Sequence, residues 1–466
     1  MEIQATTYDA YRLVHEGILA FARAERHGIR VDVEYCKKKR AHLTRKVNHL
    51  YAKLRETDLY KTWYKVYGNK LNTESNHQLA YILYTVMKMD PPKKTKSGKG
   101  STDEETLQQL NVPELDKILE IRKLLKIRDT YLNAFLKEQV HGYIHPFFNL
   151  HTVRTYRSSS DRPNFQNIPK RDEQAMKTSR RAIFPRPGHQ ILAVDFSGIE
   201  VRIACCYTED EKLIYDTLHG DMHGDMAVEL FKLDSLNKKY PGEKNLRQGG
   251  KNGFVFPQFY GDYYGNCALN LLEWAKIGSL RDGTPALEHM QNKGLVTLTK
   301  DGKVTKKGIE KFTEHVKKIE EDFWNRRYKG YKKWKEKTWE EYQKKGYIKF
   351  LTGFTYKGVA RRNELLNAPI QGTAFHSLLW CFIEVDKIAQ EEEWDTALCG
   401  QIHDEMLTDT NPDELERVAK TIQRVTCKDL PEAWPWWIIS PEVEADLCPV
   451  DASWNTKQEY KLPEVE

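Results

Sequence analysis

Long apolar runs are missing from this sequence of 466 residues. No stretch approaches the roughly 18 consecutive apolar residues that a membrane-spanning helix needs. The first residues, 1–4, have neither the basic start nor the apolar run of a secretion signal. The sequence therefore predicts a protein that has no membrane partner and stays in the cytoplasm.

Clustered cysteines are also missing. The eight cysteines, at positions 36, 205, 206, 267, 381, 399, 427 and 448, are scattered along the chain. No Cys-x-x-Cys pair stands near a second thiol or histidine pair at the spacing of a zinc site. This excludes a disulfide scaffold and a zinc ribbon, and we expect reduced thiols in the core.

The composition is that of a folded chain. Hydrophobic residues make up 40% and aromatic residues 11% of the sequence, too much apolar surface for a disordered or collagen-like chain. At roughly 100 to 200 residues per domain, the length allows two to four domains. The 73 basic and 67 acidic residues give a net charge of +6, a mild excess that hints at a polyanionic partner.

The hydrophobic pattern divides the chain into alternating helical and β-type regions. Residues 8–139 have helical periodicity, interrupted by a lysine-rich stretch at 91–100 that is typical of an exposed, flexible loop. Residues 145–195 contain short β-type runs, residues 200–345 are helical, and residues 396–408 form a strand pair. This order predicts an α+β fold, a sheet domain interrupted by a helical insertion.

Two acidic residues stand where predicted strands end. Asp195 follows the apolar run 190–194, and Asp404 follows the β-prone run 396–402. If these strands are neighbours, the two carboxylates converge and could hold two divalent cations roughly 3.5 to 4 Å apart. Magnesium is the natural ion because it prefers hard oxygen ligands. The alternative is that each Asp only caps a strand or opens a turn.

A cationic pair forms a second candidate site. Arg247 and Lys251 are four residues apart, so on a helix they share one face and could clamp a triphosphate. The alternative is a solvated basic stripe.

Five segments make the sequence recognisable, because they follow one another along the chain in the same order as in a known family. Residues 195–203 (DFSGIEVRI) resemble the first palm motif of family A of the DNA polymerases, the bacterial DNA polymerase I group and its phage relatives, and residues 401–405 (QIHDE) resemble its last palm motif. Arg247, Lys251 and the segment 256–261 (FPQFYG) are similar to its fingers helix. The segments that resemble its primer-contacting regions are 156–169 (YRSSSDRPNFQNIP) and 367–374 (NAPIQGTA).

The resemblance implies a right-hand polymerase with a helical thumb, an antiparallel-sheet palm and helical fingers. It places the amino-terminal segment and thumb at 1–140, the first part of the palm at 141–215, the fingers at 216–350 and the rest of the palm at 351–466. Residues near 262–315 exceed what bacterial members carry, and Gly302, Lys303, Lys306 and Lys307 suggest an exposed accessory segment there.

The resemblance also implies the chemistry, which is transfer of a deoxynucleotide to a primer 3′ end. Two Mg²⁺ ions, with Mn²⁺ as a substitute, would be held by the Asp195 and Asp404 carboxylates and the Phe196 carbonyl, beside Glu405 as an accessory acid. Deoxynucleoside triphosphates are the implied substrates. The family's nucleotide-binding positions, with Lys251 also catalytic, fall on Arg247, Lys251, His223, Glu200, Phe256 and Tyr260.

Two of these positions would select the sugar. Glu200 would press against it together with Tyr260 and leave no room for a 2′ hydroxyl, while Phe256 would stack on the base.

Primer-template DNA is the implied partner. Arg157, Gln371 and His403 would contact its minor groove, where acceptors common to all base pairs allow a check of pair shape. Asn164, Gln166 and Asn167 lie in the segment that meets the primer. Lys93, Lys94, Lys96 and Lys99 would touch backbone phosphates, and this binding should weaken with salt.

The sequence departs from the family pattern in two ways. One extra residue lies between Lys251 and the aromatic Phe256, and nearby glycines favour a bulge or kink; Phe254 is the rival for the stacking role. The chain also starts almost at the thumb, so we expect no 3′ to 5′ proofreading in it, and a separate exonuclease or replisome protein would be a further partner in a bacterial or phage-infected cell.

Two other functions fit parts of the pattern. A single-subunit RNA polymerase shares the palm aspartates and a fingers helix, but an acid at Glu200 under the sugar argues against ribonucleotides. A DNA-binding module that has lost its chemistry would keep the basic surface, but both aspartates are intact.

Overall fold

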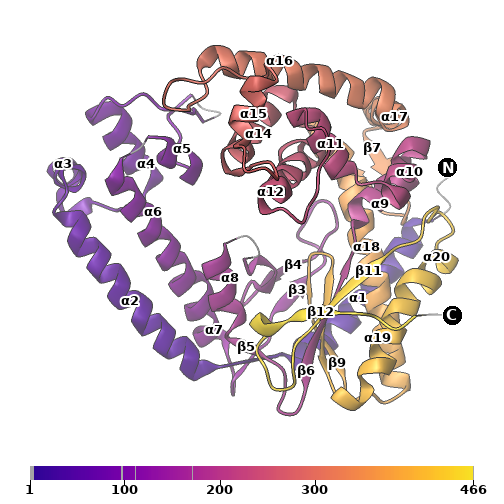
Figure 1. Cartoon of the computed structure of the whole chain (residues 1–466). Helices are drawn as coiled ribbons and strands as arrows, with labels where there is room; N and C mark the ends of the chain where they lie inside the picture. Colours follow the sequence, from indigo (N-terminus) through magenta and orange to yellow (C-terminus); the bar gives the residue numbers. More distant parts are fainter. Residues whose placement is uncertain (1–4, 96–97, 111, 170–171, 465–466) are drawn as a thin grey trace.

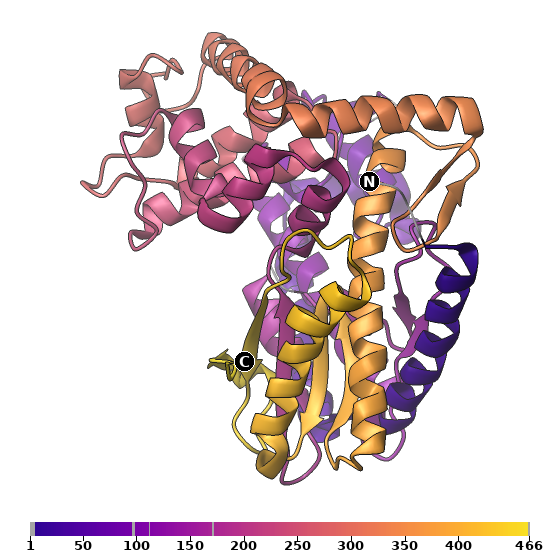
Figure 2. The same ribbon diagram turned by 90° about the vertical axis from the view of Figure 1, so that its right-hand side faces the viewer.

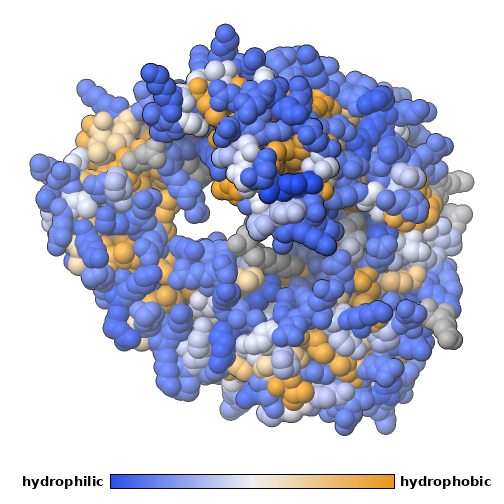
Figure 3. Space-filling model, viewed as in Figure 1, coloured by the Kyte–Doolittle hydropathy of each residue, from blue (hydrophilic) through white to orange (hydrophobic). Residues whose placement is uncertain are grey.

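The computed structural model describes residues 5–95, 98–110, 112–169 and 172–464. Three groups of elements surround a central opening, which passes between them in the space-filling view (Figures 1 and 3). An antiparallel sheet with its covering helices forms the sheet lobe, helices α2–α7 form the first lobe, and helices α10–α17 form the upper lobe.

The sheet lobe is built on five antiparallel strands in the spatial order β12-β11-β6-β10-β9. Their bounds are β6 (Gln190–Phe196), β9 (Ala397–Ile402), β10 (Glu405–Thr410), β11 (Val443–Leu447) and β12 (Gln458–Tyr460). The central strand β6 is an apolar run because helices cover one of its faces and a second core covers the other. The predicted strands at 190–195 and 396–408 are therefore confirmed.

Successive residues of β6 point to opposite faces of the sheet. Leu192 and Val194 belong to the core under the covering helices, whereas Ile191 and Ala193 belong to the core shared with the first lobe. Figure 2 shows α1, α18 and α19 side by side over the sheet. The covering helices are α1 (Thr7–His27), α9 (Ile199–Thr208), α18 (Arg362–Glu391), α19 (Leu415–Arg424) and α20 (Leu430–Ala433).

The first lobe contributes the fully buried Trp63 to this shared core, and the indole nitrogen of Trp63 donates to Gln78 at 3.1 Å. Helix α1 lies outside this lobe, since it packs on α18 and β9 and its Arg23 donates to Asp386. The helices of the first lobe are α2 (Val33–Arg55), α3 (Asp58–Tyr67), α4 (Asn76–Ala80), α5 (Glu104–Gln109), α6 (Pro113–Leu125) and α7 (Asn133–Glu138).

Short elements connect the lobes. Helix α8 (Glu173–Arg180) lies between the first lobe and the sheet, and three small sheets stand at the junctions. Their strands are β1 (Ile29–Val31), β2 (Tyr143–Ile144), β5 (Ile183–Phe184), β3 (Phe147–Asn149), β4 (Ser159–Asp161), β7 (Tyr347–Lys349) and β8 (Thr355–Lys357).

In the lysine-rich stretch of the first lobe, the described residues on the two sides of positions 96 and 97 are hydrogen-bonded to one another. Lys94 pairs with Gly100 across it, and the Thr95 amide donates to the Lys99 carbonyl at 2.6 Å. Lys93, Lys94 and Lys99 are exposed, and Lys96 lies outside the described residues. The expectation of an exposed loop is confirmed, although its backbone is more regular than the composition indicates.

The upper lobe is a helical bundle around buried aromatic side chains. The π-helical turn η5 (Gly250–Val255) joins α12 to α13, and the predicted distortion after Lys251 therefore exists. The helices are α10 (Glu211–His219), α11 (Met222–Phe231), α12 (Pro241–Gly249), α13 (Phe256–Phe259), α14 (Tyr264–Ile277), α15 (Ala286–Asn292), α16 (Lys306–Asp322) and α17 (Lys329–Lys345).

Helix α14 corrects one expectation. It falls within the predicted accessory segment 262–315, but Leu271 and Cys267 are buried and the helix packs on α12, α16 and η5. Gly302, Lys303, Lys306 and Lys307 are exposed as predicted, but α14 is not an exposed segment, because its apolar residues fill the centre of the lobe.

Two findings concern the apolar runs and the cysteines. No helix in the described part of the chain is long and apolar enough to cross a membrane. All eight cysteines are free thiols, and seven of them are buried.

Gly28, between α1 and β1, offers a test of the packing at the base of the first lobe. Its φ is +73°, and an added Cβ would lie 2.7 Å from the His145 Nδ1 atom, which a 2.7 Å hydrogen bond to the Glu25 carbonyl holds in place. Gly142 has a φ of +85° but open space around it. Gly28→Ala should lower the free energy of unfolding by about 2 kcal/mol or more, and Gly142→Ala by about 1 kcal/mol, the backbone cost alone. Equal losses in urea denaturation would contradict this packing.

Candidate active site

The register of the sheet places acidic side chains next to one another. Asp195 on β6 is paired with Glu405 on β10 and with Glu444 on β11. Directly opposed residues of antiparallel strands point to the same face, with Cβ atoms about 4.5 to 5.5 Å apart. Three carboxylates therefore stand in a row across the middle of the sheet.

Asp404 joins this row from the turn between β9 and β10. Its carbonyl oxygen accepts a 3.1 Å hydrogen bond from the Phe196 amide, which fixes the turn against the end of β6. The turn has two residues, and His403 takes a φ of +58° there, as tight turns between antiparallel strands require. The two predicted aspartates thus lie at adjacent strand ends, on either side of this hydrogen bond between Phe196 and the turn.

Glu405 is the buried member of the row. It is 2% exposed, and Lys457 lies 3.4 Å from it and 2.5 Å from Asp446. Acidic groups that face one another repel, so Lys457 offsets part of this negative charge.

The donor set suits a hard divalent cation. Asp195 and Asp404 supply carboxylate oxygens and Phe196 a backbone carbonyl, and these are the ligands that Mg²⁺ prefers. Within the described residues, no group of three or more His, Cys, Asp or Glu side chains is placed to hold a metal ion by itself. The arrangement therefore matches a site in which substrate oxygens and waters complete the coordination.

Glu200 and Tyr260 form a wall beside the aspartates. Glu200 lies in the first turn of α9, directly after β6, and it accepts a hydrogen bond from the Tyr260 hydroxyl at the end of α13. Burial and the Glu200 carboxylate raise the pKa of Tyr260 well above its ordinary value. Arg157 lies 3.5 Å from the other oxygen of Glu200. The wall thus joins the upper lobe to the sheet lobe.

The π-helical turn decides which phenylalanine faces this wall. Phe256 lines a cavity with Glu200, Tyr260, Asn367 and Gln371, whereas Phe254 is fully buried against Phe323. The extra residue is taken up within the turn, so the helix resumes with Phe256 toward the opening.

Three nitrogen donors gather near Phe256. The Lys251 ammonium lies 5.2 Å from the centre of the Phe256 ring, and the His223 ring meets the same ring edge-on. Arg247, one turn before Lys251, donates three hydrogen bonds from two of its nitrogens to Asp221. Burial, with Lys251 and Arg247 nearby, lowers the pKa of His223 to about 4. The predicted clamp is therefore a cluster, with His223 neutral at physiological pH.

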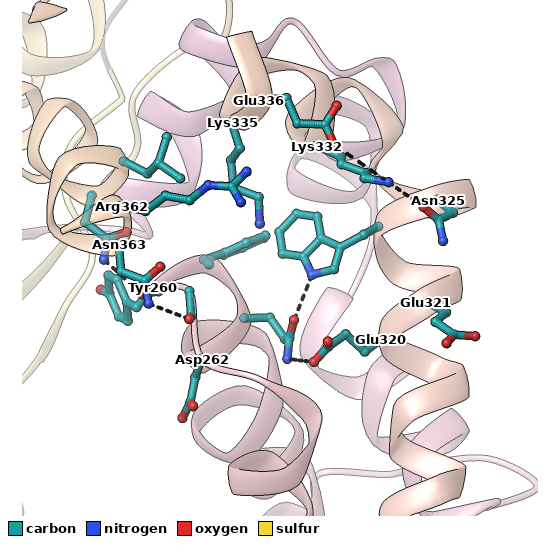
Figure 4. Close-up of a pocket in the computed structure, with 16 residues that line it drawn as sticks. Tyr260, Asp262, Glu320, Glu321, Asn325, Lys332, Lys335, Glu336, Arg362 and Asn363 are labelled. Atoms are coloured by element: carbon teal, nitrogen blue, oxygen red, sulfur yellow. Dashed lines mark hydrogen bonds and ion pairs between the residues drawn. The ribbon is translucent and has the colours of Figure 1, made fainter. Parts of the chain in front are cut away.

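A second pocket opens on the far side of Tyr260 (Figure 4). Asn363 and Asn367 at the start of α18 donate to the carbonyls of Gly261 and Tyr260 at 2.7 and 3.1 Å. Across the pocket, Lys335 lies 3.2 Å above the Trp324 ring, and burial lowers its pKa to about 7. Both basic and acidic side chains, together with Trp324, therefore line the space beyond the wall.

The predicted DNA contacts divide into two groups. Asn164, Asn167 and His403 are exposed, and Gln371 lines the cavity beside Phe256. Gln166 is buried, and its amide donates to Ser158 at 2.7 Å and to Gln401 at 2.6 Å.

The burial of Gln166 and the use of its amide donor inside the protein argue against a direct contact with DNA. Its partner Gln401 donates to the His403 carbonyl at 2.5 Å. Gln166 supports the hairpin turn instead.

Sequence reasoning missed three residues of this site. Asp221 is the N-cap of α11 and holds Arg247, and an Asp after Gly220 is a signal for a helix start that could have drawn attention to it. Asn367 lies inside the segment 367–374, and Asn363 precedes that segment by one helical turn. Their spacing could have placed both residues on the helix face that carries Gln371.

Comparison with known proteins identifies relatives along most of the chain. The family model for DNA polymerase family A matches residues 40–273 and 305–432. DNA polymerase I of Chloroflexus aurantiacus is 28% identical over 445 residues, which cover 91% of this chain and 42% of that protein. The thermostable DNA polymerase I of Thermus aquaticus is 26% identical over 434 residues, 89% of this chain and 45% of that protein. The chain thus spans less than half the length of these relatives.

The fold has a solved counterpart. The POL domain of Pol1 from M. smegmatis, in complex with DNA primer-template and dNTP, superposes with a TM-score of 0.71 at 24% identity, covering 94% of this chain and 70% of that one. The predicted right-hand polymerase fold, with helical and sheet parts, is confirmed. Because the family model matches well over half of the chain, the protein belongs to DNA polymerase family A.

Proposed function

We propose that this protein is a template-directed DNA polymerase that adds deoxynucleotides to a primer 3′ end and releases pyrophosphate. One observation carries the proposal. Asp404 is fixed against Phe196, next to Asp195, and Glu200, at the start of the following helix, is hydrogen-bonded to Tyr260 of the upper lobe, which carries the cationic cluster. Family membership supports the same reaction.

Metal ions complete the proposed site. Family A polymerases depend on metal ions in general, and we propose two Mg²⁺ ions, replaceable by Mn²⁺, held by Asp195, Asp404 and the Phe196 carbonyl. When bound, such ions would stabilise the negative charge on both the attacking and the leaving oxygen. Glu405 and Lys457 fix the electrostatic surroundings of these ligands, because their ion pair lies directly beside Asp195.

The cationic cluster would bind the triphosphate. Lys251 and Arg247 carry the positive charge that offsets developing negative charge on the phosphates. His223 would donate a hydrogen bond as a neutral ring, since its pKa of about 4 keeps it uncharged near pH 7. Phe256 would stack on the incoming base from the same helix face.

The opening between the lobes would hold primer-template DNA. Lys93, Lys94, Lys96 and Lys99 at the tip of the first lobe would meet backbone phosphates. Contacts to the primer and to the minor groove would come from Arg157, Asn164, Asn167, Gln371 and His403.

This assignment makes the first lobe the thumb, the sheet lobe the palm and the upper lobe the fingers. We place the protein in the cytoplasm of a bacterial or phage-infected cell, with a separate exonuclease or replisome protein as a further partner. Incubation of a labelled primer-template without nucleotides should leave the primer intact, because the three described lobes are assigned to thumb, palm and fingers and the proposed function includes no 3′ to 5′ proofreading.

Asp404→Asn tests the reaction itself. In primer extension with Mg²⁺ and four deoxynucleotides, the variant should lose roughly a thousand-fold or more in rate, because the carboxylate acts on the transition state. Primer-template Kd should change little. Asp413→Asn, which removes an exposed acid from the same lobe, should extend primers like the original protein. An active Asp404→Asn variant would refute the assignment.

Glu200→Ala tests the selection of sugar. Removing this side of the wall makes room for a 2′ hydroxyl, so the ratio of kcat/KM for ribonucleotides to that for deoxynucleotides should rise about tenfold or more. Glu211→Ala removes the first-turn acid of the neighbouring helix α10 and should leave this ratio unchanged. Equal use of both sugars by the original protein would favour an RNA polymerase instead.

Phe256→Tyr tests the stacking assignment. The added hydroxyl reaches the cavity beside Tyr260, where a sugar would lie, and should change the acceptance of dideoxynucleotides in chain-termination assays. Phe254→Tyr places a hydroxyl in a fully buried contact with Phe323 and should cost about 1 to 3 kcal/mol of stability without this change. The reverse pattern would show that Phe254 is the stacking residue.

A further inference from the structure

Arg247, one of the proposed triphosphate ligands, is already held by an acid of this chain. Its Nη2 atom lies 2.6 Å from Asp221 Oδ1, and its Nε atom lies 2.8 Å from Asp221 Oδ2. This is the two-pronged geometry with which arginine binds carboxylates and phosphates. The carboxylate therefore uses the donors that a phosphate would need.

Asp221 cannot easily follow Arg247 away from this position. It is the N-cap of α11, and its Oδ1 atom accepts a 3.1 Å hydrogen bond from the Gly224 amide. A carboxylate at a helix start is also stabilised by the helix dipole. Although burial acts to raise it, the pKa of Asp221 is lowered by Arg247 and by the Gly224 amide, so the side chain is an anion at neutral pH.

The other two members of the cluster are not neutralised in this way. Lys251 has no ion pair with an acid among the described residues, and its ammonium rests over the Phe256 ring. The Nδ1 atom of His223 is buried and has no hydrogen-bond partner in the described chain. The cluster thus keeps two unmatched donors for a ligand, while the third is matched internally.

We infer that Asp221 is a positioning residue that takes the place of a phosphate on Arg247 when no nucleotide is bound. Nucleotide binding exchanges one anion for another on the guanidinium, and departure of pyrophosphate returns Arg247 to Asp221. The pair therefore weakens the binding of both nucleotide and pyrophosphate. This inference rests on the proposed function, since it deepens the role of the same cluster.

Asp221→Asn separates this role from helix capping. Asparagine caps helices about as well as aspartate, so the start of α11 is kept while the charge is lost. Asp225→Asn is the matched control, because Asp225 lies on the same helix and pairs with Arg327 at 3.1 Å, away from the cluster. Equal melting temperatures of the two variants would exclude a structural cause for any difference between them.

The measurement is steady-state primer extension with the whole chain, Mg²⁺ and deoxynucleotides. Asp221→Asn should lower the KM for nucleotide and the inhibition constant of added pyrophosphate by the same factor, about three- to tenfold. This factor corresponds to the upper end of the free energies of partly exposed ion pairs, because the contact between Arg247 and Asp221 is two-pronged. Asp225→Asn should change neither. In an Arg247→Ala background, Asp221→Asn should have no further effect, because the interaction that it removes is already gone.

Binding of inorganic tripolyphosphate, measured by calorimetry, distinguishes the two possible failures. Tighter binding to Asp221→Asn than to the original protein, without any DNA synthesis by either, would overturn the proposed function and leave the exchange standing. An unchanged or raised KM in an active Asp221→Asn variant would overturn the exchange. An equal effect of Asp221→Asn with and without Arg247 would overturn it as well.

Discussion

The site depends on the backbone hydrogen bonds that hold β6 between β10 and β11. These bonds force Asp195, Glu405 and Glu444 into one row, although their charges repel one another. The Phe196 amide then fixes Asp404 beside the row. The sheet thus maintains a concentration of negative charge that only cations relieve, and Lys457 does so for the buried end of the row.

The opposite charge comes from a separate group of helices. The upper lobe carries Arg247 on α12 and Lys251 on η5, and both elements pack closely on α11. The side chains that link the two charged regions are few. Tyr260 donates through its hydroxyl to Glu200, while its carbonyl accepts from Asn367. A phosphate chain placed between the regions would meet acids with their metal ions at one end and fixed cations at the other.

Much of this arrangement could be predicted from the residues. The apolar run before Asp195 and the β-prone runs around Asp404 indicated adjoining strands, because strands buried on both faces have continuous apolar sequences. Strands β11 and β12 were not predicted. In β11, Glu444 and Asp446 interrupt the hydrophobic pattern with charged side chains that belong to the site. The count of residues after Lys251 predicted a distortion there, but only its three-dimensional form separated Phe256 from Phe254.

The misses have a common physical cause. Gln166 occurs in a segment that meets the primer in the family, yet its burial depends on Ser158 and Gln401, which approach it only through the fold. Asp221 has the sequence signature of a helix cap, and its partner lies 26 positions away in the chain. Periodicity reports what one element does locally, whereas these roles arise from contacts between elements.

Helix α18 has a consequence for movement. It runs for 30 residues, from the asparagines that hold the end of α13 to the acid that binds Arg23 of α1, and it contains Pro369 in its buried interior. A proline there removes one main-chain hydrogen bond and weakens the helix at that turn. Pro369 lies between Asn367 and Gln371. If the upper helices tilt when a substrate binds, α18 would therefore bend near Pro369. The part of the helix after this residue, with the sheet beneath it, would keep its position.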